Sequence, residues 1–216
     1  CHENWLLAST TPVQEIVMDV AAQGLNALKK RYRDIVGVDP SDVELQGYYD
    51  QVSLALEMMK NYNDRYGGPL PDDFTLVQPE QTLLVPIPDT EHQLEGTLDA
   101  LLRDAGGRLW IKENKTFENH PKINDLQMND QFISYMWMLS QLNLGEIGGV
   151  LYDGMWKRPM QSARKLRTLD ELFTREPLIW SPGEIFNHGQ QLRDEALDMS
   201  DPEMRIYPNR PFMGCW

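Results

Sequence analysis

The first third of the chain has the apolar spacing of helices. Thr11-Pro12-Val13-Gln14 combines a capping residue, a proline for the first turn and a glutamine at the third position, which is typical of a helix start. Ser41-Asp42-Val43-Glu44 is a second capping box, and Gly67-Gly68-Pro69 ends the long helix that it begins. We therefore expect residues 1–70 to form a helical segment whose apolar and aromatic stripe packs into the core.

Beyond Pro71 the apolar residues follow the pattern of strands. Three strands are predicted, over residues 75–87, 93–103 and 108–115. Pro79 places the first half of the first strand at a sheet edge or a bulge. A helix, a buried strand and a second helix are predicted next, over residues 124–142, 148–155 and 181–199. This order predicts an α/β fold for residues 71–216, with helices around a central mixed sheet.

Composition is that of an ordinary globular protein. The 216 residues suffice for one sizeable domain, and 41% of them are hydrophobic. No apolar run approaches the ~20 residues that span a bilayer, so we expect no membrane contact. Cys1 and Cys215 cannot build a disulfide framework and no secretory signal is visible, which favours a cytoplasmic protein. Neither Cys1 nor Trp216 resembles a natural terminus, so we also expect a domain truncated at both ends.

Charge bears on the choice of partner. The net charge is −13, whereas nucleic-acid binding depends on Lys and Arg. One stretch is basic, however, and holds Lys157, Arg158, Arg164, Lys165, Arg167 and Arg175. It is either a solvated face or a strip that contacts phosphates, and the pattern leaves both interpretations open.

The predicted hairpin of residues 93–115 carries the candidate chemistry. Strand side chains alternate, so Glu113 and Lys115 point to the same face, and the hairpin brings Asp99 alongside them. Charged groups are costly to bury in a sheet without partners, which favours a functional role. Two carboxylates suit Mg²⁺ or Mn²⁺, and the lysine can act on a metal-bound water and on the phosphate of a phosphodiester.

The register of this hairpin decides whether the three groups meet. A loop of residues 104–107 would pair Asp99 with Lys112, on the wrong face. A three-residue loop, 105–107, with a glycine in the left-handed region pairs Asp99 with Glu113. We predict the second arrangement, or a bulge equivalent to it.

These residues resemble the motifs of the PD-(D/E)XK nuclease superfamily. The run is Gly96-Thr97-Leu98-Asp99, then Glu113-Asn114-Lys115-Thr116, then Gln131 followed four residues later by Tyr135. It is most similar to the branch of RecB-type, phage and CRISPR-associated exonucleases. The motifs span residues 96–135, and their order and spacing together are fairly specific.

The resemblance implies a restriction-endonuclease-like core and a DNA exonuclease of bacterial or phage recombination and repair. By resemblance, Asp99 and Glu113 bind the metal, the main-chain carbonyl of Asn114 completes its shell, and Lys115 is the catalytic lysine. Gln131 and Tyr135 would support the site or contact the DNA backbone, and a helicase or recombination protein is the implied partner. Glu80, on the preceding strand, is a further candidate and equally an exposed edge residue.

Two features of the family are missing here. The family has an earlier helix with a metal-binding histidine, but His2 stands at the start of the chain, so we expect that helix to lie upstream. Relatives also carry an iron–sulfur cluster on four cysteines, which Cys1 and Cys215 alone cannot form, so a cluster is possible only in a longer parent chain. His92, His120 and His188 are scattered singly.

Two other functions are compatible with parts of this pattern. Asp99 and Glu113 could form the acid/base pair of a glycosidase, but Lys115 would keep both acids ionised, whereas a general acid needs a raised pKa. A catalytically inactive nuclease-like domain that binds DNA or acts as a scaffold is the stronger alternative, favoured by the acidic net charge.

Overall fold

Two long helices precede the sheet. The computed structural model describes residues 13–68, 70–119, 126–162, 165–201 and 203, with side chains from Met18 onward. Helix α2 is Val13–Val36 and helix α3 is Asp42–Tyr66. The predicted capping box at Ser41 is confirmed, since its backbone N–H donates to the Glu44 carboxylate at 2.7 Å and its hydroxyl accepts from the Glu44 N–H. Gly67, with φ of 71°, ends α3 in the left-handed conformation.

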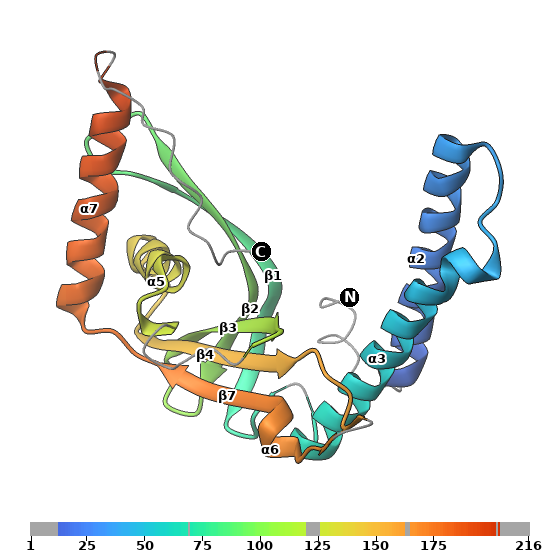
Figure 1. The fold of residues 1–216 in the computed structure, drawn as a ribbon. Helices are drawn as coiled ribbons and strands as arrows, with labels where there is room; N and C mark the ends of the chain where they lie inside the picture. The colour runs from blue at the N-terminus through green and yellow to red at the C-terminus, as the bar shows by residue number, and fades with distance from the viewer. Residues whose placement is uncertain (1–12, 69, 120–125, 163–164, 202, 204–216) are drawn as a thin grey trace.

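Five strands form a mixed sheet in the order β1-β2-β3-β4-β7 (Figure 1). They are β1 Phe74–Pro86, β2 Gln93–Asp104, β3 Leu109–Phe117, β4 Ile147–Trp156 and β7 Phe173–Leu178. Strands β3 and β4 are parallel, and the other neighbouring pairs are antiparallel. The fold is therefore α/β with a central mixed sheet, as predicted.

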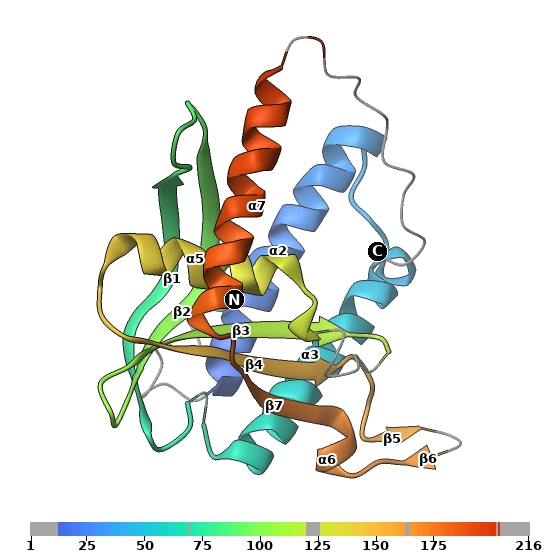
Figure 2. The same ribbon diagram turned by 90° about the vertical axis from the view of Figure 1, so that its left-hand side faces the viewer.

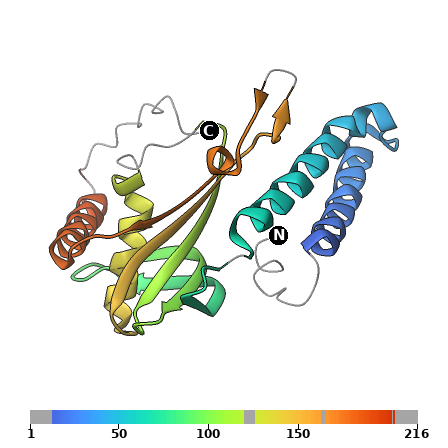
Figure 3. The same ribbon diagram turned by 90° about the horizontal axis from the view of Figure 1, so that it is seen from below.

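Helices lie on both sides of the sheet. Helix α5, Asp130–Leu142, and helix α7, Pro182–Ser200, lie on one side, and the α2–α3 pair lies on the other (Figures 1 and 3). The short helix α6, Leu169–Leu172, precedes β7 and contacts α3. A ribbon of β5, Gln161–Ser162, and β6, Lys165–Leu166, projects beside α6 (Figure 2). No helix within the described ranges is long and apolar enough to span a membrane.

Three details differ from the sequence-based expectation or refine it. Helix α5 begins at Asp130, because the Asn129 side chain caps it by accepting the Gln131 N–H at 2.9 Å; Asn124 lies outside the described residues. Strand β7 was not predicted. Strand β1 is an edge strand with a register shift between Leu76 and Gln78, so the edge and the irregularity predicted from Pro79 are confirmed.

The middle of the sheet is buried from both sides. The first six residues of β3 are buried, and so are eight consecutive residues of β4. The largest apolar cluster lies between the sheet and helices α5 and α7, and a second one joins α3 to β4, α6 and β7. Among the buried positions of β3 and β4 are Lys112, Glu113, Asn114 and Asp153, so the centre of the sheet contains polar groups that need partners.

Candidate metal centre

The β2–β3 hairpin has the predicted register. The Asp104 N–H donates to the Arg108 carbonyl at 3.0 Å, so the loop is residues 105–107, and Gly107 has φ of +85°. Ala100 lies opposite Lys112, and the same register extended by one residue places Asp99 opposite Glu113. The three-residue loop with a left-handed glycine is confirmed, and the alternative pairing of Asp99 with Lys112 is excluded.

Asp99 sits where the alternation of β2 breaks. Leu98 and Leu101 both belong to the cluster beneath α5 and α7, although they are three positions apart and strict alternation would separate them. Continued pairing would direct the Asn114 N–H to the main chain of β2, but that N–H donates to Oδ2 of Asp99 at 2.7 Å. The Asp99 carboxylate thus turns toward the main chain and the side-chain amide of Asn114, and the Asn114 side chain lies on the face opposite Glu113. The simple same-face arrangement of Asp99 with Glu113 and Lys115 that we expected is therefore not what the structure shows.

Glu113 is almost completely buried, with 2% of its surface exposed. Its Oε1 forms an ion pair with the Lys115 ammonium at 2.6 Å and accepts a hydrogen bond from Gln131 Nε2 at 3.3 Å. Its Oε2 is also buried, yet no hydrogen-bond donor in the described parts of the chain reaches it. Burial raises the pKa of Glu113, the Lys115 ammonium lowers it and the neighbouring Asp99 carboxylate raises it further. One of the two oxygens of the ionised carboxylate therefore has no hydrogen-bond donor to offset the cost of its burial.

Helix α5 supplies the two residues that hold Glu113 from above. Gln131 donates to the hydroxyl of Tyr135 at 2.8 Å, and that hydroxyl donates to the carbonyl of Thr97 in β2 at 3.0 Å. This arrangement requires the glycine at position 96, because a Cβ there would lie 2.6 Å from Cε1 of the Tyr135 ring. The fold therefore brings Gln131 to Glu113, and Tyr135 ties Gln131 to the strand that carries Asp99.

Hard oxygen donors suited to Mg²⁺ or Mn²⁺ are present at this point. They are the buried Oε2 of Glu113, the Asp99 carboxylate, whose charge raises the pKa of Glu113, and, by position in β3 between Glu113 and Lys115, the main chain of Asn114. Within the described ranges no group of three or more His, Cys, Asp or Glu residues gathers, so a cation here would keep several waters. An uncompensated carboxylate oxygen and a second acid beside it fit such an ion.

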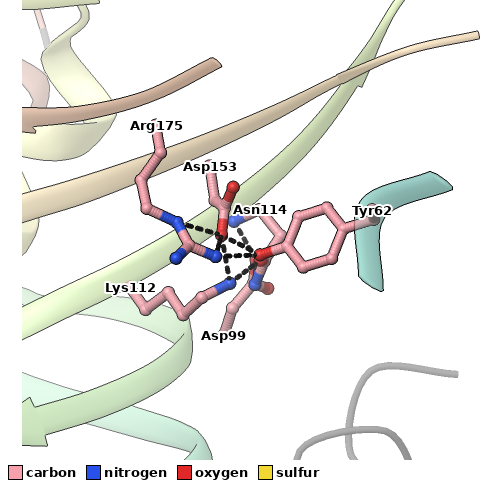
Figure 4. Close-up of polar contacts among 6 residues, drawn as sticks. All are labelled: Tyr62, Asp99, Lys112, Asn114, Asp153 and Arg175. Atoms are coloured by element: carbon pink, nitrogen blue, oxygen red, sulfur yellow. Dashed lines mark hydrogen bonds and ion pairs between the residues drawn. The ribbon is translucent and has the colours of Figure 1, made fainter. Parts of the chain in front are cut away.

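Sequence reasoning missed a polar network on the opposite face of the sheet. Figure 4 shows Tyr62, Lys112, Asp153 and Arg175 converging on one point beside Asn114 and Asp99. Lys112 and Asp153 are both fully buried and form an ion pair at 2.9 Å. A lysine and an aspartate inside apolar strands were the available signal, because unpaired charges are not tolerated there.

The remaining candidates are placed differently. Glu80 is exposed on the edge strand β1, at the register position opposite Asp99, and has φ of 39°. His92 bonds to the Ser200 hydroxyl at 2.8 Å, and His188 bonds to the Ser134 hydroxyl at 2.8 Å. His2, His120, Cys1 and Cys215 lie outside the described residues.

The basic stretch is split among different roles. Lys165 pairs with Glu171 at 2.5 Å, and Arg175 belongs to the buried network through its contact with Asp153. Lys157 and Arg158 are exposed just beyond β4, at the end of the sheet near which Lys115 lies in β3. Arg164 lies outside the described residues. Among the described members of this stretch, a phosphate-contacting strip is reduced to a few exposed cations.

Comparison with known proteins adds little about function. No family model matches the sequence, and no curated protein matches it. Sixteen chains of solved structures match, among them a crystal structure of SSO0001 with 9% sequence identity and a TM-score of 0.34. The match covers 91% of this chain and 90% of that one. A likeness of this size supports no inference about activity.

Proposed function

We propose that this chain is a metal-dependent deoxyribonuclease of the PD-(D/E)XK type that hydrolyses phosphodiester bonds. The observation that carries the proposal is the buried Oε2 of Glu113, which lacks a hydrogen-bond donor in the described structure while Oε1 is held by Lys115. A cation beside Oε2 and Asp99 offsets the cost of that buried charge. The residues around it then have roles that match phosphodiester hydrolysis.

Lys115 is the group best placed to meet a substrate. Its side chain is 41% exposed, whereas that of Glu113 is 2% exposed, so the ammonium joins the buried carboxylate to the surface. Mg²⁺ or Mn²⁺ bound at the centre would lower the pKa of a water and offset charge on the phosphate. Lys115 then orients that water and stabilises the negative charge that develops on the phosphate oxygens.

Gln131 and Tyr135 are positioning residues in this scheme. Gln131 donates to Glu113 at 3.3 Å, and its own amide is held by the Tyr135 hydroxyl at 2.8 Å. Ligands fixed by outer hydrogen bonds bind metals more tightly than mobile ones. The pair thus keeps the Glu113 carboxylate in one orientation during metal binding.

A DNA partner and a place in recombination or repair follow from the motif resemblance and are part of the proposal. An inactive scaffold is the second candidate, because the net charge is −13 and Lys165 and Arg175 are occupied by Glu171 and Asp153. It predicts DNA binding, or binding to a helicase or recombination protein, without cleavage in any metal.

The first test is cleavage of linear and circular DNA in Mg²⁺ and in Mn²⁺. We expect Lys115→Ala to lose cleavage by about 100-fold or more while remaining folded. Lys60→Ala is the matched control, since Lys60 is also an exposed lysine, 3.7 Å from Asp64 on α3. Cleavage of linear DNA alone identifies an exonuclease. Equal activity of Lys115→Ala and the wild type refutes the assigned role.

The second test separates a metal ligand from a packing residue. Glu113→Gln keeps the shape of the side chain and removes its charge. Burial is the main cause of the raised pKa of the Glu113 carboxyl that this variant replaces. We expect this variant to lose Mn²⁺ binding in calorimetry and to unfold at a higher temperature than the metal-free wild type. If Glu113→Gln binds Mn²⁺ with the affinity of the wild type, Glu113 is not a metal ligand.

A further inference from the structure

The buried network opposite α5 forms a row across the sheet. In the register of β3, β4 and β7, Asn114 lies opposite Asp153, and Asp153 lies opposite Arg175. Residues opposite one another on neighbouring strands point to the same face, so the three side chains are adjacent (Figure 4). Lys112 joins them from two positions earlier in β3, on the same face.

Asp153 is the centre of this row. Its fully buried Oδ2 accepts from Lys112 Nζ at 2.9 Å and from Arg175 at 3.0 Å and 3.2 Å. The hydroxyl of Tyr62, on α3, donates to the same oxygen and accepts from Arg175. Removing any one partner of such a group leaves a buried charge uncompensated, so the geometry of the four residues is tightly constrained.

Lys112 determines which way the Asn114 amide points. An ammonium can only donate, and Lys112 Nζ donates to Oδ1 of Asn114. The Nδ2 donor of the same amide is therefore turned toward Asp99, where it lies 3.3 Å from Oδ2. Together with the Asn114 N–H at 2.7 Å, it gives Asp99 two donors on one oxygen. The orientation of the Asp99 carboxylate thus depends on Lys112 through the Asn114 amide.

Helix α3 enters the same arrangement through Tyr62. The ring is fully buried between α3, β4 and β7, and the Arg175 guanidinium lies 5.5 Å from its centre and 3.9 Å from that of Tyr66. The packing of α3 on the sheet therefore fixes Arg175, which with Lys112 fixes Asp153.

We propose that Lys112, Asp153, Arg175 and Tyr62 form a positioning network that orients Asp99 through Asn114, so that the docking of α3 sets the metal affinity of the centre. This inference rests on the proposed metal site. Partners that orient a ligand typically change metal affinity by about 10–100-fold when they are removed, without contacting the ion.

The test is Mn²⁺ affinity of folded protein, measured by calorimetry, for Lys112→Met and for Leu151→Ala. Leu151 is a buried residue of the same face, 5% exposed, on the strand that carries Asp153, so its truncation loosens the core without removing a polar partner. We expect Lys112→Met to weaken Mn²⁺ binding by about 10–100-fold and Leu151→Ala to leave it unchanged. If Lys112→Met does not fold, Tyr62→Phe is compared with Tyr66→Phe, and only the first should weaken binding.

The measured Mn²⁺ affinities distinguish the positioning network from the metal site itself. Equal affinity of the wild type and Lys112→Met overturns the positioning network and leaves the metal site standing. Equal weakening by Lys112→Met and Leu151→Ala also overturns it, because general loosening then explains the loss. A wild type that binds no Mn²⁺ overturns the proposed function and the network with it.

Discussion

Replacing Gly96 by alanine tests the contact that joins β2 to helix α5. A Cβ at this position would lie 2.6 Å from Cε1 and 3.2 Å from Cδ1 of Tyr135, and 3.3 Å from the sulfur of Met138. Carbon atoms pack at about 3.5–4.0 Å, so the tyrosine ring must move by about 1 Å. The ring is anchored by its hydroxyl, which bonds to the Thr97 carbonyl at 3.0 Å and to Gln131 at 2.8 Å.

Both the steric strain and the lost hydrogen bonds contribute to the expected loss of stability in Gly96→Ala. Overpacking of this kind costs about 1–3 kcal/mol, and each hydrogen bond that lengthens beyond its range costs about 1 kcal/mol. We expect the free energy of unfolding to fall by about 2 kcal/mol, which lowers Tm by about 4–8 °C in a chain of this size. Because Gln131 also holds Glu113, nuclease activity should fall more than stability alone would explain.

Urea unfolding and Mn²⁺-dependent cleavage are the measurements. Gly47→Ala is the control, since no heavy atom lies within 4 Å of a Cβ at that helical position, and it should be neutral or stabilise the fold by about 0.5–1 kcal/mol. The decisive variant is Gly96→Ala combined with Tyr135→Ala, which should be no less stable than Tyr135→Ala alone. If the losses in the free energy of unfolding of the two single variants add up in the double variant, the Tyr135 ring is not the reason why position 96 requires a glycine.

Three further predictions concern the rest of the fold. Ser181→Ala removes the side-chain cap of α7 and should cost about 1 kcal/mol in urea unfolding, whereas an unchanged midpoint would show that the cap contributes nothing. Burial lowers the pKa of His188, so the stability that its neutral form contributes is present above pH ~6.5 and is lost as the pH falls through its lower folded-state pKa. The stability advantage of the wild type over His188→Gln should therefore shrink between pH 7.5 and about 5, and a constant difference contradicts this. Gly149→Ala should prevent folding or lower Tm severely, because φ is +153° and a Cβ would lie 2.4 Å from the Leu178 carbonyl; a Tm near that of the wild type would contradict the close approach of β4 and β7.

Local sequence patterns were sufficient to predict most of the helices and strands. Capping residues and apolar spacing predicted the extent of α3 and α7, and alternation predicted β2 and β3 within two residues of their bounds. Strand β7 was missed because Thr174-Arg175-Glu176-Pro177 is a polar run that resembles a loop. It pairs as an edge strand, where a proline is tolerated and where Arg175 gains a buried partner in Asp153.

The candidate site was predictable only in part. The loop of residues 105–107 follows from turn chemistry, and with it the pairing of Asp99 with Glu113, because a hairpin register depends on its turn. The turn of the Asp99 carboxylate toward Asn114 was not predictable. It depends on a break in the alternation of β2 and on donors from β3, which become neighbours only in the folded sheet.

By itself, then, the sequence determined an α/β domain and the hairpin register that places Asp99 opposite Glu113, because these depend on contacts between residues close in the chain. Only the tertiary structure decided that Tyr62 reaches Asp153, 91 positions away, and that Lys112 orients the amide beside Asp99. Residues that far apart in the chain leave no periodic pattern in the sequence when they become partners. They come together because an unpaired charge is costly to bury in the assembled core.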